Sequence, residues 1–537
     1  MALSEKLGAL DLTILILYLV GIVALGIWAG LKRRGQTAGA GYFLAGRSLR
    51  WPVIGLALFA TNISTVHLVS LAQEGYVNGL AYGNFEWMAA FTLIILALVF
   101  APFYVRTQVA TLPEFLERRY SRASRYWLTV LSIVSAIFIH IGFTFYAGAV
   151  VLEGLFGIDK MTSIVLVAAV TGIYTIVGGL MAVVITESVQ TIILLAGAIL
   201  LTAIAWFRAG GWEGITAVVD PHQLTMLRPK GDPSGLPWYS VLLGYPVIGI
   251  WYWCTDQTIV QRVLGAKDET HASLGALFAG FIKILPVFIF VLPGLICGVL
   301  IKQGALPDTL KESEQVYAFM IGNLLPAGLR GLVAAALLAA LMSTVSGALN
   351  SAATLFSHDI YRRFIPGASD RSLVTVGRIA TFVGLVLAVA WSPFLGRYPS
   401  VFQGINAAIC YIAPPITVVF VFGVFWRGAS STGSIVTLVA GSALGFAVFL
   451  LDWFKESTGW NVPFMMAGFY LACACAVIMA CTSLVVPDAP SVERAALTWA
   501  SPLAPFRREP GQSLGKPMIA AALLCAVMVL LYVEFGR

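Results

Sequence analysis

The chain has 537 residues, of which 59% are hydrophobic and only 11% are charged, and its formal net charge is +7 at pH 7. Soluble domains carry about 25% charged residues, so this composition excludes a soluble protein and predicts an integral membrane protein. The excess of cations does not indicate a nucleic-acid partner, because membrane topology and attraction to anionic lipid account for it.

Apolar runs of about 20 residues, the length that crosses a lipid bilayer as a helix, recur along the whole sequence. They leave no room for a sizeable soluble domain. We expect fourteen spans, at 9–31, 51–72, 80–104, 126–154, 161–179, 183–207, 238–260, 271–301, 325–356, 373–395, 400–425, 431–453, 463–485 and 516–535.

Lysine and arginine gather in alternate connections between these spans. The connections at 105–125 and 357–372 are rich in them, whereas 73–79 and 155–160 are nearly free of them. Short cytoplasmic loops carry such an excess. We therefore predict a multi-pass protein of the plasma or inner membrane, with both termini outside the cell or in the periplasm.

The second span is interrupted at its middle by polar side chains. These are Thr61, Asn62, Ser64, Thr65 and His67. Irregular or polar backbone at membrane depth is tolerated only inside protein or against a water-filled cavity, and such breaks are typical of a transporter's binding site. We expect carbonyls at 60–63 to coordinate a cation and Asn62 and His67 to bind a polar solute. A kink satisfied by neighbouring helices is the alternative.

Two charges lie inside predicted spans, Glu86 in the third and Lys283 in the eighth. Charged side chains at such depth are costly and usually functional. Each could hydrogen-bond the hydroxyls of a solute, and a purely structural salt bridge is the alternative.

The polar connection at 208–237 divides the chain into comparable halves. The seventh span, 238–260, is irregular like the second, with Gly244, Pro246 and Gly249 in its middle. Paired interruptions of this kind indicate inverted repeats. Within one transporter domain we predict a leading helix and loop (1–50), two five-helix repeats (51–207 and 238–425) and three additional helices (426–537).

Further oxygen ligands cluster late in the chain. Ala340, Ser343 and Thr344 share one helical face and offer two hydroxyls and a carbonyl, which suit a hard cation. Close helix packing through small residues is the alternative. Glu187, about one turn inside its span, could hold a cation or lie at the membrane interface.

Several stretches together resemble the sodium/solute symporter family, and most closely its sodium/glucose cotransporter branch. They include FATNISTVHLVSLA (59–72), GNFEWMAA (83–90), WYWCTDQTIVQRVLGAK (251–267) and LMSTVSGALNSAATLFSHDIY (341–361). The resemblance implies an all-α polytopic membrane protein of about fourteen helices. It also implies a ten-helix inverted-repeat core of the leucine-transporter type, with broken first and sixth core helices.

The resemblance also implies site residues. Sodium would bind the carbonyls of Ala60, Ile63 and Ala340 and the hydroxyls of Ser343 and Thr344. Some relatives have a second sodium site with an Asp and two hydroxyls, where this chain has Glu187, Ser346 and Gly347. We therefore expect one sodium per cycle, and a second ion at Glu187 and Ser346 is the alternative. Tyr252 would be the inner gate. The solute contacts would be Asn62, His67, Glu86, Trp253, Lys283 and Asn406, where Asn406 replaces the family's usual glutamine. The sequence also departs from its relatives at His140 and Gly249.

These features predict a sodium-coupled symporter that imports a glucose- or galactose-like monosaccharide by alternating access. We expect sodium as the coupling ion and the sole metal, and no cofactor. We also expect no enzymatic activity, since the five histidines are dispersed and no nucleophile and base can be assembled from local spacing. The alternatives are a non-sugar solute, such as inositol, an organic acid or an amino acid, and a sugar sensor or sodium leak on the same scaffold.

Overall fold

The computed structural model describes residues 8–32, 47–109, 111–397, 400–501, 503–506 and 515–536, and for some helical residues, among them 177–191, it describes the backbone alone. Within these ranges the chain is helical and contains no β-strand beyond two isolated bridges. The predicted all-α class is confirmed.

The helices up to the long connection at 208–237 include both halves of the interrupted second span. They are α1 (Ala9–Lys32), α3 (Trp51–Asn62), α4 (Thr65–Asn78), α5 (Asn84–Ile95), α6 (Ala101–Thr107), α7 (Leu112–Arg119), α8 (Arg122–Val134), α9 (Gly142–Phe156), α10 (Lys160–Arg208), α11 (Gly211–Thr216) and α12 (Pro221–Leu224).

The second part of the chain begins with another interrupted helix. Its helices are α13 (Trp238–Ile250), α14 (Gln257–Leu264), α15 (Glu269–Ile282), α16 (Leu292–Lys302), α17 (Val316–Leu324), α18 (Leu329–Thr354), α19 (Arg362–Phe364), α20 (Asp370–Trp391), α21 (Val401–Phe425), α22 (Ser431–Trp453), α23 (Lys455–Thr458), α24 (Phe464–Val485), α25 (Val492–Ala496) and α26 (Gly515–Phe535).

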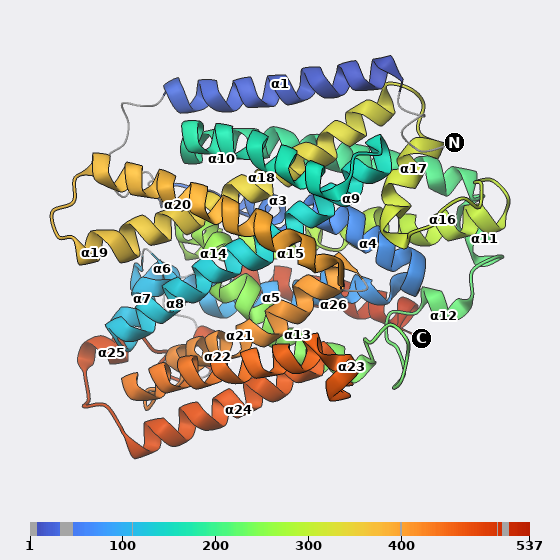
Figure 1. The fold of residues 1–537 in the computed structure, drawn as a ribbon. Coiled ribbons are helices and arrows are strands. Elements are labelled where there is room, and N and C mark those ends of the chain that lie inside the picture. Colours follow the sequence, from blue (N-terminus) through green and yellow to red (C-terminus); the bar gives the residue numbers. More distant parts are fainter. Residues whose placement is uncertain are drawn as a thin grey trace.

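The long helices run side by side as one bundle, with α1 and α24 at opposite edges of the view in Figure 1. In the described residues, nine stretches are long and apolar enough to cross a membrane, and four shorter apolar helices accompany them. Several of these stretches contain a π-helical turn, such as Leu96–Phe100 between α5 and α6 and Ser135–Ile141 between α8 and α9. The count of fourteen spans stays a prediction.

The first helix break lies where the sequence predicts it. Helix α3 ends at Asn62, and Ile63 and Ser64 are extended, with ψ angles of 123° and 174°, before α4 begins. The break in the second half lies later than the glycines and proline suggest. Pro246 stays inside α13, and the chain leaves the helix at Asp256, whose side chain accepts a bond from the N–H of Thr258 at 2.8 Å. A capping carboxylate stabilises a new helix start, which explains the shift.

The connection that we expected at 180–182 is absent from the described backbone, because α10 is helical from Lys160 to Arg208. The predicted break between the spans 161–179 and 183–207 is therefore wrong for this structure, whereas the number of membrane crossings within these 49 residues stays a prediction. The pair Gly178 and Gly179 is the sequence feature that predicts a break here. Glycine costs a helix only about 1 kcal/mol relative to alanine, whereas an unpaired backbone group in an apolar environment costs several, so helical pairing can continue through both.

One end of the bundle carries α7, α19 and α25, and we call it the basic end because these short helices contain arginines such as Arg119, Arg363 and Arg494. The start of α1 and the end of α26 lie at the opposite end of the bundle, which also carries α11 and α12 (Figure 1).

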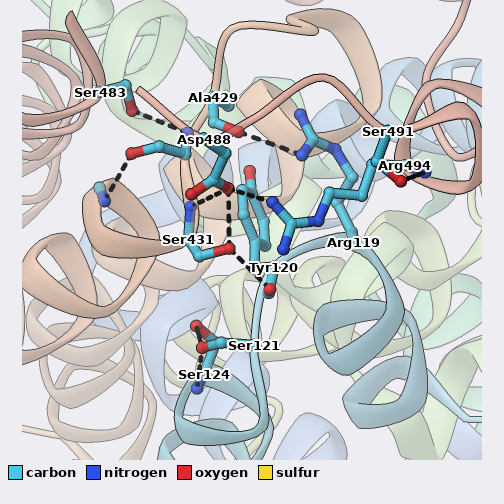
Figure 2. Close-up of polar contacts among 12 residues, drawn as sticks. Arg119, Tyr120, Ser121, Ser124, Ala429, Ser431, Ser483, Asp488, Ser491 and Arg494 are labelled. Carbon is cyan, nitrogen blue, oxygen red and sulfur yellow. Dashed lines mark hydrogen bonds and ion pairs between the residues drawn. The ribbon is translucent and has the colours of Figure 1, made fainter. Parts of the chain in front are cut away.

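At the basic end, α7 is tied to the C-terminal helices by a buried polar cluster, the α7 seam, drawn in Figure 2. Arg119 donates to the carbonyls of Gly423, Ala429 and Trp426 at 3.0, 3.1 and 2.8 Å. The hydroxyl of Ser431 lies 2.7 Å from the carbonyl of Tyr120 and 2.8 Å from Asp488, which also pairs with Arg494 at 2.5 Å. The seam thus satisfies carbonyls that the end of α21 leaves without helical partners.

Candidate functional site

A cavity opens at the α3–α4 break. Its lining comes from both halves of the chain, since α3, α4 and α5 meet α13, α15, α18 and α21 around it. The lining residues are Thr61, Asn62, Ser64, Val66, His67, Phe85, Glu86, His140, Thr144, Tyr245, Ile248, Gly249, Tyr252, Trp253, Lys283, Thr344, Phe402, Ile405, Asn406 and Ile409. Every residue predicted for the solute or the inner gate is among them.

The two predicted intramembrane charges contact each other. The ammonium of Lys283 is bonded to Glu86 Oε2 and donates to Asn62 Oδ1 at 2.6 Å. Lys283 is 1% exposed and Glu86 is 2% exposed. A buried ion pair repays its desolvation only when further hydrogen bonds complete it, and Asn62 supplies one here.

Local backbone structure positions both partners. Glu86 lies in the first turn of α5, where the helix dipole favours a carboxylate. Lys283 lies directly after α15 ends at Ile282. Pro286 has no N–H to donate to the carbonyl of Ile282, so the helix ends there, and the lysine side chain reaches the cavity from this turn.

Asn62 and His67 extend the polar network along the break. Asn62 donates through Nδ2 to the hydroxyl of Tyr252 at 3.1 Å. His67 Nδ1 lies 3.3 Å from the backbone N of Ser64 and 3.1 Å from its hydroxyl, and His67 Nε2 lies 3.9 Å from Glu86 Oε1. The network therefore joins the predicted inner gate to the predicted solute ligands.

Aromatic rings form the remaining walls. Phe85 and Phe402 pack edge to face with centroids 4.9 Å apart, and the ring of Phe402 also lies 6.4 Å from that of His67. The ammonium of Lys283 lies 5.7 Å from the ring centroid of Trp253. A ring face beside a dense set of hydrogen-bonding groups suits a flat solute that carries hydroxyls.

The predicted sodium ligands occupy two segments that meet at one side of the cavity. The hydroxyls of Ser343 and Thr344 both donate to the carbonyl of Ala340, at 2.8 and 3.1 Å. Thr344 lines the cavity together with Thr61 and Asn62 from the break. Ala60, Ile63, Ala340 and Ser343 belong to the same segments but are not among the lining residues. The arrangement brings α18 to the break, and the ion site itself stays a prediction.

The second predicted sodium site is only half described. Ser346 is fully buried, and its hydroxyl donates to the carbonyl of Ser343 at 2.9 Å. Glu187 lies in α10, and its side chain is outside the described residues. Within the described part of the chain, no three His, Cys, Asp or Glu residues come together in a group that could hold a metal ion through these side chains.

Sequence reasoning did not assign several lining residues, among them Phe85, Phe402, Thr144 and Tyr245. Phe402 precedes Asn406 by four residues, and the backbone carbonyl of Phe402 accepts a bond from Asn406 Nδ2 at 2.9 Å. Helical residues four apart share a face, so this spacing could have identified Phe402. Tyr245 donates to the carbonyl of Phe85 at 2.9 Å, a contact that no local pattern predicts.

The comparisons with known proteins agree with this architecture. The family model described as "Sodium:solute symporter family" matches residues 42–441. Sodium/glucose cotransporter 1 of Sus scrofa is 33% identical over 539 residues, covering 92% of this chain and 81% of the relative. Sodium/myo-inositol cotransporter 2 of Oryctolagus cuniculus is 36% identical over 484 residues, covering 84% and 72%.

Solved structures support the fold. An outward-open, substrate-bound sodium-coupled sialic acid symporter aligns with a TM-score of 0.76 at 22% identity, covering 90% of this chain and 99% of that one. A nucleobase-cation-symport-1 family transporter aligns with a TM-score of 0.53 at 14% identity, covering 84% and 97%. The inverted-repeat transporter fold predicted from the sequence is confirmed. This chain belongs to the sodium:solute symporter family, a family of transporters and not of enzymes, with sodium as the coupling ion.

Proposed function

We propose that this chain imports a neutral polyhydroxyl solute, a glucose- or galactose-like monosaccharide, together with sodium by alternating access. The observation that carries the proposal is the buried pair of Glu86 and Lys283, completed by Asn62, in a cavity with aromatic walls. The two charges cancel, so the cavity favours a neutral solute. Carboxylate oxygens accept and the ammonium donates, which matches hydroxyls that do both.

In this proposal the solute contacts are the six lining residues Asn62, His67, Glu86, Trp253, Lys283 and Asn406. Tyr252 is the inner gate. Its hydroxyl accepts a bond from Asn62, so a movement of the gate changes a solute ligand directly.

Sodium binds between α3 and α18 in the proposed cycle. Its ligands are the carbonyls of Ala60, Ile63 and Ala340 and the hydroxyls of Ser343 and Thr344. Each hydroxyl already donates its proton to Ala340, which leaves oxygen lone pairs for a cation. The proposed cycle moves one sodium ion, and a second ion at Glu187 and Ser346 is the alternative.

We also propose that both termini face outside the cell or the periplasm and that 51–207 and 238–425 are the two inverted repeats. The location of the arginine-rich helices at the end of the bundle opposite the start of α1 and the end of α26 (Figure 1) supports this orientation, because cytoplasmic loops carry the excess of arginine and lysine. The two broken helices, α3–α4 and α13–α14, are the corresponding members of the repeats.

Inositol is the strongest second solute, because a curated sodium/myo-inositol cotransporter is 36% identical to this chain. An inositol ring carries the same neutral hydroxyls and fits the same chemistry. Organic acids fit less well, because the Glu86–Lys283 pair has no net charge to balance an anion, and an amino acid would have to break that pair for its own two charges to be matched. A sensor or sodium leak would bind the solute without concentrating it.

Uptake by proteoliposomes tests the proposal. The purified chain is reconstituted, and labelled glucose, galactose, myo-inositol, an organic acid and an amino acid are offered with an inward sodium gradient or with choline in its place. We expect sodium-dependent accumulation of a monosaccharide above equilibrium. Accumulation of only a carboxylate would reject the sugar assignment, and sodium currents without accumulation would indicate a leak or sensor.

A further inference from the structure

The α3–α4 break contains a hydrogen-bond exchange that links the two proposed sites. In an unbroken helix the backbone N–H of Ser64 would donate to the carbonyl of Ala60, four residues earlier. Here it donates to Nδ1 of His67 at 3.3 Å. The N–H is thereby capped by a side chain, and the carbonyl of Ala60 is left available for an ion.

The same contacts fix the state of the imidazole. A backbone N–H can only donate, so Nδ1 of His67 must accept, and the ring proton of the neutral histidine is on Nε2. The Ser64 hydroxyl lies 3.1 Å from the same nitrogen and can donate a second bond to it. The backbone N–H of His67 in turn donates to the carbonyl of Ser64 at 3.0 Å, which closes the first turn of α4.

The Nε2–H then faces the carboxylate of Glu86 across a gap of 3.9 Å, too long for a direct hydrogen bond. One solute hydroxyl fits between them at ordinary distances of about 2.8 Å, with an angle at its oxygen of about 90°. That hydroxyl accepts from His67 and donates to Glu86. A carboxylate oxygen of a solute could accept but not donate.

We propose that Ser64 and His67 form a coupling cap, in which one set of hydrogen bonds keeps the Ala60 carbonyl open for sodium and holds His67 Nε2–H toward a solute hydroxyl. The inference rests on the proposed function and deepens it, since it states how one break serves both ligands. Ser64 is a positioning residue in this arrangement, and His67 has two separable roles, one for each ring nitrogen.

Two substitutions of His67 separate these roles. His67→Asn keeps an acceptor at the position of Nδ1 but removes the distant donor, whereas His67→Gln keeps a donor near the position of Nε2 and removes the acceptor. We expect His67→Asn to raise the KM for solute at saturating sodium at least tenfold, with little change in sodium binding. We expect His67→Gln to weaken sodium binding about fivefold or more and to raise the solute KM less.

Sodium binding is measured without solute, as the rise in Tm of the purified protein when sodium chloride replaces choline chloride. Solute KM is measured separately by uptake into proteoliposomes. Ser64→Ala should raise both the dissociation constant for sodium and the KM for solute a few-fold, and Ser64→Thr should restore both. In the His67→Gln background, Ser64→Ala should have no further effect, because the two residues act through one bond.

Thr61→Val is the matched control. Thr61 lines the same cavity, but its hydroxyl donates to the carbonyl of Ala57 at 2.7 Å, so the effect of Thr61→Val should add to that of His67→Gln. If His67→Asn and His67→Gln change sodium and solute binding in the same proportion, or if Ser64→Ala and His67→Gln are additive, the coupling cap is wrong. If the wild-type protein shows neither a sodium-dependent Tm nor sodium-dependent uptake, the proposed function fails instead.

Discussion

The candidate cavity and the α7 seam both bury charged side chains, but the cavity, unlike the contacts of the seam described above, contains facing polar groups that no hydrogen bond joins. In the seam, each of the three guanidinium nitrogens of Arg119 donates to a backbone carbonyl. In the cavity, Lys283 bonds to Glu86 and Asn62, but His67 Nε2 and Glu86 Oε1 face each other at 3.9 Å, too far apart for a hydrogen bond. Burial of charge therefore does not by itself identify a binding site.

The gap between His67 and Glu86 is the feature that distinguishes a candidate binding site from a structural contact. A buried polar group without its full set of partners costs about 1–3 kcal/mol, and a folded protein retains that cost where a ligand later completes the set. This argument supports the proposal that a solute binds in the cavity, whereas the seam is a structural contact between α7, the end of α21 and the segment around Asp488.

The largest expected effect comes from separating Lys283 and Glu86. We predict that Lys283→Met and Glu86→Gln each reduce solute uptake about 100-fold or more, because each removes a proposed solute ligand and leaves the partner's charge unpaired in the cavity. Each should also lower Tm, because removing one partner of a buried pair destabilises the folded protein by about 3–5 kcal/mol. The measurements are sodium-driven uptake and the Tm of the purified variants.

The double variant distinguishes the two roles of the pair. Lys283→Met with Glu86→Gln leaves no unpaired charge, so its Tm should return toward that of the wild type while uptake stays lost. A wild-type KM for solute in either single variant would remove the pair from the site.

The second prediction concerns the seam. Arg119→Lys cannot serve three carbonyls in the fixed geometry of a guanidinium, so we expect a loss of stability of about 2–4 kcal/mol. The KM for solute of the protein that remains folded should be unchanged. Arg363→Lys, at a more exposed position on the same end of the bundle, is the control and should lose less stability. A KM change above threefold in Arg119→Lys would contradict the comparison.

The residues of the candidate cavity could be predicted from the sequence more readily than those of the α7 seam. Asn62, His67, Glu86 and Lys283 stand out because polar residues interrupt apolar runs, and the energetic penalty at membrane depth makes each one conspicuous. Arg119 lies in a basic connection where arginines are expected for topology. Its burial follows from tertiary contacts with carbonyls some 300 positions away, which no local pattern contains.

The breaks were predicted with unequal success for a related reason. At 63–64 a polar cluster marks the place where the helix opens. In the second half, the glycines and Pro246 predict a break earlier than Asp256, where the chain actually leaves the helix. In α10, Gly178 and Gly179 predict a break that the backbone does not have. Helix-breaking residues report a local cost of only a few kcal/mol, and packing against neighbouring helices decides whether that cost is accepted.

The third prediction tests the proposed sodium ligands on α18. We expect Ser343→Ala and Thr344→Ala each to raise the sodium concentration for half-maximal uptake about tenfold, or about 1.4 kcal/mol. Thr354→Ala is the control, because its hydroxyl donates to the Asn350 carbonyl at 2.8 Å in the same way but ten residues further along the helix. Equal effects of all three variants would indicate a change in the helix and not the loss of a ligand.

The smallest expected effect concerns Glu117, a partly exposed residue at the basic end. Its carboxylate pairs with Arg363 through two bonds of 2.9 and 3.0 Å and also with Arg125. Burial raises the pKa of the Glu117 carboxyl, but hydrogen bonds and charges from the two arginines outweigh burial, so its pKa is lowered from the ordinary value. A carboxyl with a lowered pKa in the folded state stabilises the protein above its unfolded pKa of about 4.3, and this contribution is lost as the pH falls further, through the folded value.

We therefore predict that Glu117→Gln lowers stability by up to about 1 kcal/mol at pH 7, as expected for a partly exposed ion pair, and that the difference from wild type narrows below pH 4. Thermal unfolding in choline chloride measures this without contributions from sodium binding, and high choline chloride should shrink the difference at pH 7 by screening. Glu114→Gln, whose partner Arg118 lies 3.8 Å away on the same helix, should have less effect. A stability difference between Glu117→Gln and wild type that is constant from pH 7 to pH 3.5 would contradict this prediction. It would mean that Glu117 stabilises the protein through packing, as the buried contacts of the α7 seam do, and not through its charge.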